Sequence, residues 1–342
     1  MTRRFEIRGP EWLPGAGQLT MLQMLLIGLA AGLASGLLFA SLLAGSLFSF
    51  LLFYLAPLPI MIAGLGWSHF AALLAALVAA AGLAAAFGGL LFAAFLVGLG
   101  LPAWWLSYLA LLARPAPASP DGTQWFPVGR LVLWAAVLGA LSIVIAIPTF
   151  GTDAHSFRAG LKAAFEQLLR SATDTPGSAP LTFPGGADPE RLLDALVIAT
   201  PPIAAAASAI ASLGNLWLAA RIVRLSGRLR RPWPDVGSMV LPRYAAALLA
   251  AAIAAIFAGD LIGTVGAVLA ASLLVAYAVL GLAVVHATTR GLNGRSFVLA
   301  GIYASVAVFG WPALLLSVLG LVDLVVDFRR RVRRHRLPDT ST

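Results

Sequence analysis

Long apolar runs alternate with short polar segments along this chain, and the length of each run predicts how often it crosses a membrane. The runs cover residues 19–64, 69–113, 131–150, 192–220, 244–289 and 297–328. A spanning helix needs about 20 apolar residues. The runs 19–64, 69–113 and 244–289 therefore predict two crossings each, and 131–150 and 192–220 predict one. Alternation at period 2, which is typical of a β-barrel, is absent.

Glycine and proline mark the turns within the longer runs, because both residues break helices. We place these turns at Gly45-Ser46, Gly88-Gly89 and Gly259-Asp260. The last run turns at Phe309-Gly310-Trp311-Pro312 and leaves arms of about 14–15 residues, or roughly 22 Å. Such arms are shorter than the roughly 30 Å hydrocarbon core. We therefore expect an all-α polytopic bundle of about ten spans, or of eight spans plus a re-entrant hairpin.

The arginines set the orientation of this bundle. They precede the first run, flank the loop 114–130, follow the runs 192–220 and 244–289, and close the chain. Basic residues favour cytoplasmic loops, and a hairpin in every double-length run puts all these clusters on one side. The chain is thus expected to be one integral membrane domain, 1–342, with both termini in the cytoplasm. The loop 114–130 is then cytoplasmic, and 329–342 is a basic cytoplasmic tail.

The segment 151–190 has charges of both signs and falls on the opposite, extracytoplasmic side. Within it, Phe157–Ala172 carries apolar residues at helical spacing with charged residues between them. This pattern predicts an amphipathic helix that either lies on the membrane surface or caps the bundle.

Composition agrees with a membrane protein. Of 342 residues, 60% are hydrophobic and 11% are charged, whereas soluble domains carry about 25% charged residues. The net charge of +9 comes from arginines beside apolar runs, where they orient the protein and contact anionic lipid. We therefore expect membrane lipids, and no nucleic acid, as partners. Lys162 is the single lysine, and this preference for arginine suggests a GC-rich bacterium and an inner-membrane location.

The residue inventory excludes several kinds of site. The chain has no cysteine, so it has no disulfide and no thiolate metal site. Its four histidines lack metal-ligand spacing. Walker A, GxSxG, HExxH and GxGxxG motifs are also missing. We expect no metal, no cofactor, no enzymatic activity and no ATPase of its own.

Two groups of small or helix-weakening residues are candidates for special roles. Gly28, Gly32 and Gly36 lie four apart, and such a stripe lets another helix approach closely, either within the molecule or in a dimer. Gly100 and Pro102 weaken the fourth predicted span. That span is either a broken helix that lines a polar site or a kinked helix with an aromatic belt at the interface.

Three polar or proline positions complete the candidate ligand-binding set. The sixth predicted span holds Pro202 and Asn215. An amide in hydrocarbon is costly unless it is paired, so Asn215 either bonds a neighbouring helix or coordinates a substrate. His286 is ionisable at membrane depth and is therefore a functional candidate, although its place near a helix end also fits simple exposure at the interface.

Five segments resemble a bacterial membrane family catalogued as domain of unknown function 2232, the YybS-like predicted membrane proteins. They are LAPLPIMIAGLGWSH (55–69), LVGLGLPAWWLSYLALLAR (96–114), LGNLWLAARI (213–222), GLAVVHATTRG (281–291) and LGLVDLVVDFRRR (319–331). The family is distantly similar to substrate-binding subunits of energy-coupling-factor transporters and to the rod-shape protein MreD. The resemblance implies a compact helical membrane bundle, and it assigns no catalytic or binding residue.

These features favour a membrane protein that binds or transports a small molecule or lipid without its own motor. The alternative is a non-catalytic scaffold that organises membrane-protein partners of the cell envelope. A polar interior lined by the fourth, sixth and eighth spans would favour the first hypothesis. A packed apolar interior would favour the second.

Overall fold

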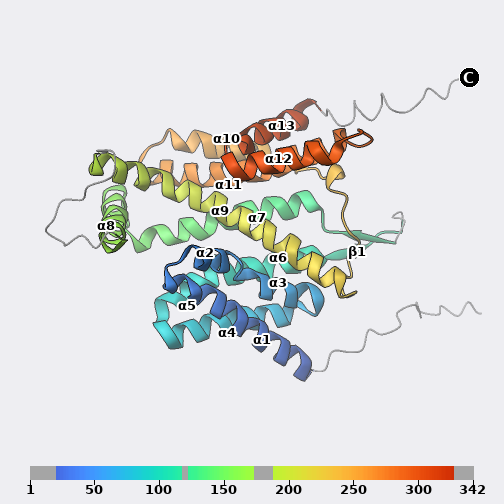
Figure 1. Ribbon diagram of the computed structural model, residues 1–342, viewed down its shortest axis with the longest axis horizontal. Helices are drawn as coiled ribbons and strands as arrows, with labels where there is room; N and C mark the ends of the chain where they lie inside the picture. The colour runs from blue at the N-terminus through green and yellow to red at the C-terminus, as the bar shows by residue number, and fades with distance from the viewer. Residues whose placement is uncertain (1–20, 118–121, 173–187, 327–342) are drawn as a thin grey trace, which may run out of the picture.

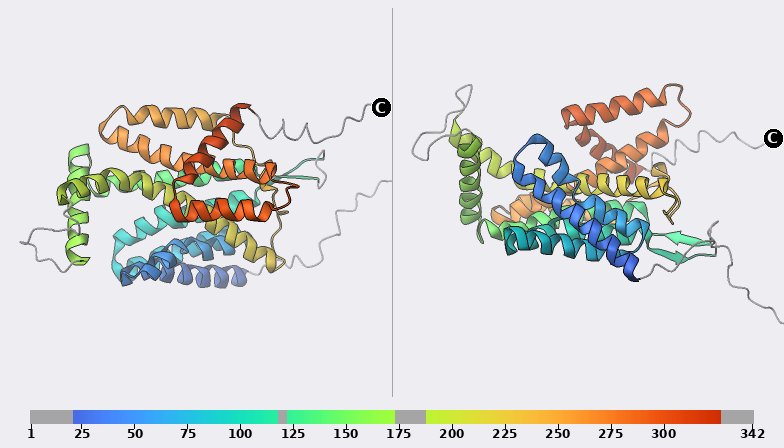
Figure 2. Two further views of the ribbon diagram at one scale, coloured as in Figure 1. Left: turned by 45° about the horizontal axis from the view of Figure 1, so that its top comes forward. Right: turned by 60° about the horizontal axis from the view of Figure 1, so that its bottom comes forward.

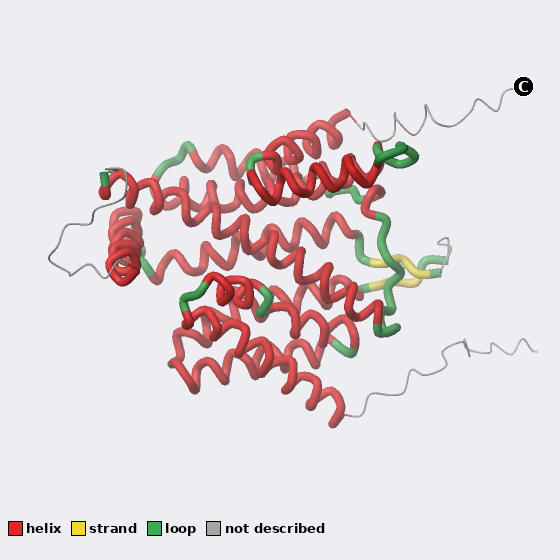
Figure 3. The backbone as a smooth tube through the Cα atoms, viewed as in Figure 1, coloured by secondary structure: helices red, strands yellow, loops and turns green. Residues whose placement is uncertain are grey.

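The computed structural model of the protein describes residues 21–117, 122–172 and 188–326, and it is a bundle of helices with one short β-hairpin in this described part (Figure 1). The predictions for the N-terminal segment and for the basic tail 329–342 lie outside the described residues. The helices run back and forth between two ends of the bundle (Figure 3). The all-helical fold predicted from the sequence is confirmed.

The first half of the chain forms α1 (Met21–Ala40), α2 (Leu47–Tyr54), α3 (Pro57–Gly66), α4 (His69–Phe87), α5 (Gly89–Phe95) and α6 (Leu101–Leu111). The second half forms α7 (Val128–Ala146), α8 (Ala154–Ala172), α9 (Pro189–Leu225), α10 (Tyr244–Ile256), α11 (Asp260–Thr288), α12 (Arg295–Phe309) and α13 (Pro312–Val326). Strands β1 (Ala113–Pro115) and β2 (Thr123–Trp125) pair antiparallel between α6 and α7. They form a short hairpin over most of whose length, from Arg114 on, the sequence predicts the loop 114–130.

Seven stretches of helix in the described residues are long and apolar enough to cross a membrane. They are Met21–Ala44, Phe48–Gly66, His69–Phe87, Gly89–Leu111, Val128–Thr149, Pro189–Leu225 and Asp260–Thr288. The three other apolar helices, α10, α12 and α13, are shorter. The predicted count of about ten therefore includes three helices that do not reach spanning length.

The predicted turns coincide with helix ends. Gly45, Gly88, Gly259 and Gly310 have φ values of 64°, 98°, 73° and 70°. Residues with a side chain rarely adopt positive φ values, whereas glycine does so without steric cost. The reversals of direction are thus encoded locally, at the residues that the sequence singled out.

Two predicted interruptions are milder than expected. Helix α9 continues through Pro201 and Pro202 over its 37 residues, although proline removes a backbone donor. The stretch Leu96–Gly100 is a π-helical segment between α5 and α6, so the chain stays helical where glycine and proline predicted a break. A π-helical turn absorbs an extra residue without opening the helix.

The interior is apolar and tightly packed. One core joins α3, α4, α6 and the C-terminal part of α9, through residues such as Ile60, Ala76 and Leu106. A second core joins α7, α10 and α11, through residues such as Ala136 and Leu273. Alanine is frequent in both, because small side chains let membrane helices approach closely.

Helix α8 lies across one end of the bundle (Figure 1). Its Phe157 and Leu161 are buried in a small cluster with Ile147 and Val197. Lys162 Nζ donates to Asp194 Oδ1 of α9 at 3.1 Å, and this bond raises the pKa of Lys162. Of the two arrangements expected for the amphipathic helix, the contacts correspond to a cap on the bundle. Its extracytoplasmic side stays a prediction.

Helix α12 lies at the edge of the molecule (Figure 2). None of its residues is buried, and its main packing partner is α13. Glycines with positive φ stand on both sides of it, at Gly291, Gly294 and Gly310. Helix α12 is thus the least embedded apolar helix of the described bundle.

Candidate functional site

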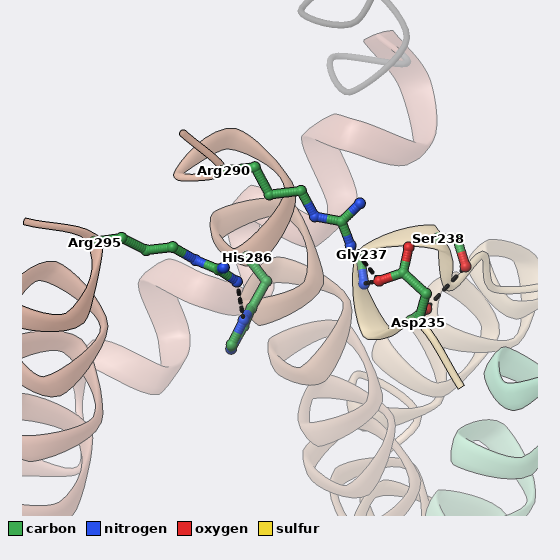
Figure 4. A network of polar contacts seen from close by, with 6 residues as sticks. All are labelled: Asp235, Gly237, Ser238, His286, Arg290 and Arg295. Atoms are coloured by element: carbon green, nitrogen blue, oxygen red, sulfur yellow. Dashed lines mark hydrogen bonds and ion pairs between the residues drawn. The ribbon is translucent and has the colours of Figure 1, made fainter. Parts of the chain in front are cut away.

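A network of polar side chains lies where α11 ends and α12 begins (Figure 4). His286 and Arg290 come from the last turn of α11 and the residues after it, and Arg295 is the first residue of α12. Asp235 precedes the short helical turn Val236–Ser238 in the connection between α9 and α10. Three separate segments therefore contribute side chains to one place. We call these residues, together with Tyr303, the α11–α12 network.

His286 stands between two side chains of α12. Its Nε2 lies 3.0 Å from the hydroxyl of Tyr303, and its Nδ1 lies 3.5 Å from Nη2 of Arg295. A guanidinium has only donors, so Nδ1 of His286 must act as the acceptor in that contact. The proton of the neutral ring is then on Nε2 and points to Tyr303. These two side-chain contacts join α12 to α11.

Arg290 and Asp235 form an ion pair across the connection. Both side chains are 49% exposed. Asp235 also accepts from the backbone N–H of Gly237 at 3.1 Å, and its backbone carbonyl accepts from Ser238 Oγ at 2.8 Å. The carboxylate is thus held in place by its own turn before it meets Arg290.

Arg295 is the cation with the least compensation in this network. Its Nε is buried and has no hydrogen-bond partner, and no described carboxylate lies within ion-pair distance of its guanidinium. Arg290 and Arg295 against the single Asp235 leave one net positive charge when His286 is neutral. A buried donor without a partner is rare in native structures and calls for an explanation.

The connection between α9 and α10 also contacts other segments at this end of the bundle, through two of its arginines. Arg231 donates to the backbone carbonyls of Ala110 and Phe126, at 3.0 and 2.9 Å. Burial lowers the pKa of Arg231. The guanidinium of Arg228 lies 4.7 Å from the ring centre of Trp67, a cation–π contact. The arginines of this connection are therefore structural parts of the fold as well as topological signals.

Asn215 serves to join two helices. Its side chain is 4% exposed, and Nδ2 donates to the carbonyl of Tyr54 at 2.7 Å and to that of Ala211 at 2.8 Å. The first bond ties α9 to the end of α2. Oδ1 is buried without a partner. Of the two roles expected from the sequence, the contacts correspond to helix–helix bonding.

The other predicted ligand-binding residues lie apart from this network. Gly100 and Pro102 are buried, and a Cβ on Gly100 would lie 3.2 Å from Ala76 of α4. Pro202 precedes Asn215 by thirteen positions in α9, or about 20 Å along the axis. No described contact joins these residues to His286. The structure therefore distributes the five candidates over four places: Gly100 with Pro102, Pro202, Asn215, and His286.

An aromatic cluster is formed by α6 together with α4 and α7. Trp104, Trp105 and Tyr108 of α6 contact one another, with Trp105 5.7 Å from Trp134 of α7 and Tyr108 5.3 Å from His69 of α4. These are the α6 residues that the sequence offered as an interfacial aromatic belt, and their depth in the membrane stays a prediction. Such belts place rings with a polar edge at headgroup depth.

Sequence reasoning missed Asp235, Arg295 and Tyr303 as members of a site. Arg295 and Tyr303 follow His286 by nine and seventeen positions, across a turn, so no helical spacing connects them. Asp235 is fifty-one positions earlier. The described residues contain no group of three His, Asp or Glu side chains that could hold a metal ion. The two arginines and the tyrosine hydroxyl in this arrangement present donors, and donors suit an anionic ligand.

Comparison with known proteins gives one match. A family model described as "Predicted membrane protein (DUF2232)" matches residues 20–324, which include every described helix except the last two residues of α13. Neither a curated protein nor a solved structure matches the chain. The matched range takes in the seven stretches of spanning length, which agrees with the description of the family. The chain therefore belongs to the DUF2232 family of predicted membrane proteins.

Proposed function

We propose that this protein binds a lipid or small molecule through an anionic group at the α11–α12 network, and that it does so without catalysis and without an ATPase of its own. The single observation that carries the proposal is Arg295, whose guanidinium has a buried Nε without a partner and no described carboxylate beside it. A phosphate or carboxylate oxygen is the strongest partner for such a group.

The location of the network suits a ligand from the membrane. We propose that the arginine-bearing end faces the cytoplasm of a bacterial inner membrane, because basic residues favour that side. Arg290 and Arg295 then lie at headgroup depth, at the foot of a helix that is exposed along its length. Anionic headgroups are concentrated there, so a lipid can approach without entering the bundle.

The interior of the bundle supports binding at the edge more than passage through the middle. Ser272 on α11 is buried and donates to the carbonyl of Ala136 at 2.6 Å. Ser317 on α13 donates to the carbonyl of Leu274 at 2.8 Å. Asn215 likewise uses its amide for backbone carbonyls. Polar side chains that bond the backbone stabilise helix packing and leave little polar surface for a substrate path.

Native mass spectrometry of protein gently extracted from its own membrane tests the proposal. We expect a co-purifying lipid or small molecule with an acidic group. Arg295→Gln should reduce the retained ligand by about fivefold, since one arginine near an anionic headgroup contributes about 1 kcal/mol. Arg243→Gln is the matched control, because it removes the same charge from the start of α10, where Arg243 is exposed. Equal losses of retained ligand in both variants would show that any removed positive charge has this effect. That result would contradict a specific site at Arg295.

A scaffold without a ligand is the second candidate, and both the packed apolar interior and α12 favour it. This helix has no buried residue, and Phe297, Val308 and Phe309 are 86%, 73% and 65% exposed. A partner helix could cover this face. Extraction that yields the protein with a second polypeptide and no acidic ligand would favour the scaffold over the binding protein.

A further inference from the structure

His286 is the member of the α11–α12 network whose charge can change near neutral pH. In its neutral form, Nδ1 accepts from Arg295 and Nε2–H donates to Tyr303. Both ring nitrogens therefore have a partner, and this pair of contacts requires a neutral ring with its single proton on Nε2. The Arg295 contact is long, at 3.5 Å, so the two groups are neighbours that are only loosely bonded.

We propose that the network binds a phosphate group together with one proton taken up by His286, so that binding strengthens as the pH falls. This inference rests on the anion site proposed above and adds the chemical class of the ligand and its coupling to pH. No covalent bond forms or breaks. A proton from solvent adds to Nδ1 of His286, and a phosphate oxygen occupies the position between that nitrogen and Arg295.

The hydrogen-bond inventory explains why proton and phosphate enter together. Protonated His286 has donors on both nitrogens, and Arg295 has donors only. Their direct contact would then bring two donors and two positive charges together. An anionic oxygen that accepts from both removes this conflict. Tyr303 can still accept from Nε2–H, because its hydroxyl oxygen has free lone pairs.

The charges that face His286 come from each element packed around it. Arg290 follows it on the α11 side, Arg295 and Tyr303 belong to α12, and Asp235 reaches in from the α9–α10 connection. Helix α13 packs on both α11 and α12 and carries Asp323, a buried residue, as its one charged side chain in the described range. Protonation of His286 raises the net charge of Asp235, His286, Arg290 and Arg295 from one to two positive charges.

A phosphate matches the donors of His286, Arg290 and Arg295 better than a ligand with one acceptor oxygen. It offers several oxygens, so one can lie between His286 and Arg295 while another reaches Arg290, whose side chain is half exposed. Arginine and phosphate form paired hydrogen bonds of good geometry. The group can come from a lipid headgroup or from a soluble phosphate, and both sources present the same chemistry to the network.

The experiment uses the full chain in phosphatidylcholine nanodiscs, with two probes. Inorganic sulfate is a soluble tetrahedral anion whose charge does not change between about pH 5.5 and about pH 8, the range over which a histidine titrates. Phosphatidic acid, added to the nanodisc, is the lipid source. We expect sulfate binding in wild type to strengthen by up to about tenfold per pH unit as the pH falls, the limit for one coupled proton.

Variants and a direct proton count keep the test decisive. His286→Gln should bind sulfate with an affinity that no longer changes with pH, while His155→Gln, an exposed histidine at the start of α8, should keep the wild-type slope. Calorimetry of wild type in two buffers of different ionisation enthalpy counts the protons taken up, so the result does not depend on the folding of a variant. We expect about one proton per sulfate.

The outcomes separate this inference from the proposed function. Binding that depends on Arg295 but takes up no proton would overturn the coupling and leave the anion site in place. No binding of sulfate or phosphatidic acid anywhere between about pH 5.5 and about pH 8 would overturn both the inference and the proposed function. Proton-coupled binding supports the inference, and displacement of sulfate by phosphatidic acid in the nanodisc would then identify the lipid as the preferred source.

Discussion

Two helix crossings in this protein depend on glycine, and they differ in what the glycine touches. On α1, Gly28 and Gly32 are buried against α4, where an added Cβ would meet the side chains of Leu74 and Val78. On α11, an added Cβ at Gly281 would overlap the backbone carbonyl of Leu316, and one at Gly320 of α13 would overlap that of Tyr277. Helices α1 and α4 therefore cross closely, and α11 and α13 cross so closely that their backbones are in contact.

The difference shows that a glycine stripe is a poor guide to where glycine matters most. The three glycines spaced by four on α1 are conspicuous in the sequence, yet they differ among themselves. Gly28 meets the side chain of Leu74, which can move, Gly32 meets the carbonyl of Ala75 as well as Val78, and Gly36 has only ordinary contacts with Ala79. Gly281 and Gly320 are isolated glycines in two different helices, and their neighbours are carbonyl groups that cannot move without shifting a helix. The α11–α13 crossing is also part of the packing that carries α12 and its polar network.

The largest effect is expected from Gly281→Ala. The new methyl group overlaps the carbonyl of Leu316, so α13 must move away from α11, at a cost of about 3 kcal/mol. Thermal unfolding in nanodiscs should show this loss, and crosslinking between α11 and α13 should weaken. Stability equal to wild type would show that the crossing is looser than described.

Gly32→Ala should have an intermediate effect. Its Cβ would lie 2.7 Å from the carbonyl oxygen of Ala75 and 2.7 Å from Cβ of Val78. We expect a loss of about 1–2 kcal/mol, measured by the same unfolding assay. Gly32→Ala combined with Val78→Ala should recover only a small part of the loss, because it removes the 2.9 Å contact with Cγ1 of Val78 and keeps the contacts with its Cβ and with the carbonyl oxygen of Ala75. No recovery would assign the whole cost to those two remaining contacts.

The next effect compares a serine of the α11–α13 crossing with a serine of α1 that bonds the residue before α3. Ser317→Ala removes a bond to Leu274 between α13 and α11, and Ser35→Ala removes a buried bond from α1 to Ala56. Hydrogen bonds between membrane helices average about 0.6 kcal/mol, so we expect similar small losses. A much larger loss for one serine would show that its pair of helices depends more on the polar contact.

The smallest effect is expected from Gly36→Ala. The nearest heavy atom to its Cβ is Cα of Ala79 at 3.6 Å, which is an ordinary van der Waals distance. Alanine also favours the helix over glycine by up to about 1 kcal/mol. Unfolding should therefore show a change within about 0.5 kcal/mol, or a slight gain. A clear loss would extend the close crossing by one more turn of α1.

The sequence predicted the elements well and the candidate site poorly. The helix ends at Gly45, Gly88 and Gly259 follow from local backbone preference, which a single sequence displays. His286 was singled out because an ionisable residue at membrane depth is conspicuous; the structure places it in the α11–α12 network, and its binding role stays a prediction. Gly100, Pro102 and Pro202 were singled out for weakening helices, whereas in the structure they lie within continuous helical packing.

The sequence by itself determined that this chain is a helical membrane protein and where its helices reverse. It also predicted that the arginine clusters gather at one end of the bundle. These properties depend on the length of apolar runs and on local residue type. Only the tertiary structure decided that Gly281 meets Leu316, that Asn215 bonds α2, and that Arg295 lies beside His286 with no described carboxylate partner. Such contacts arise from the packing of helices far apart in the chain, and packing depends on the shapes of all neighbours together.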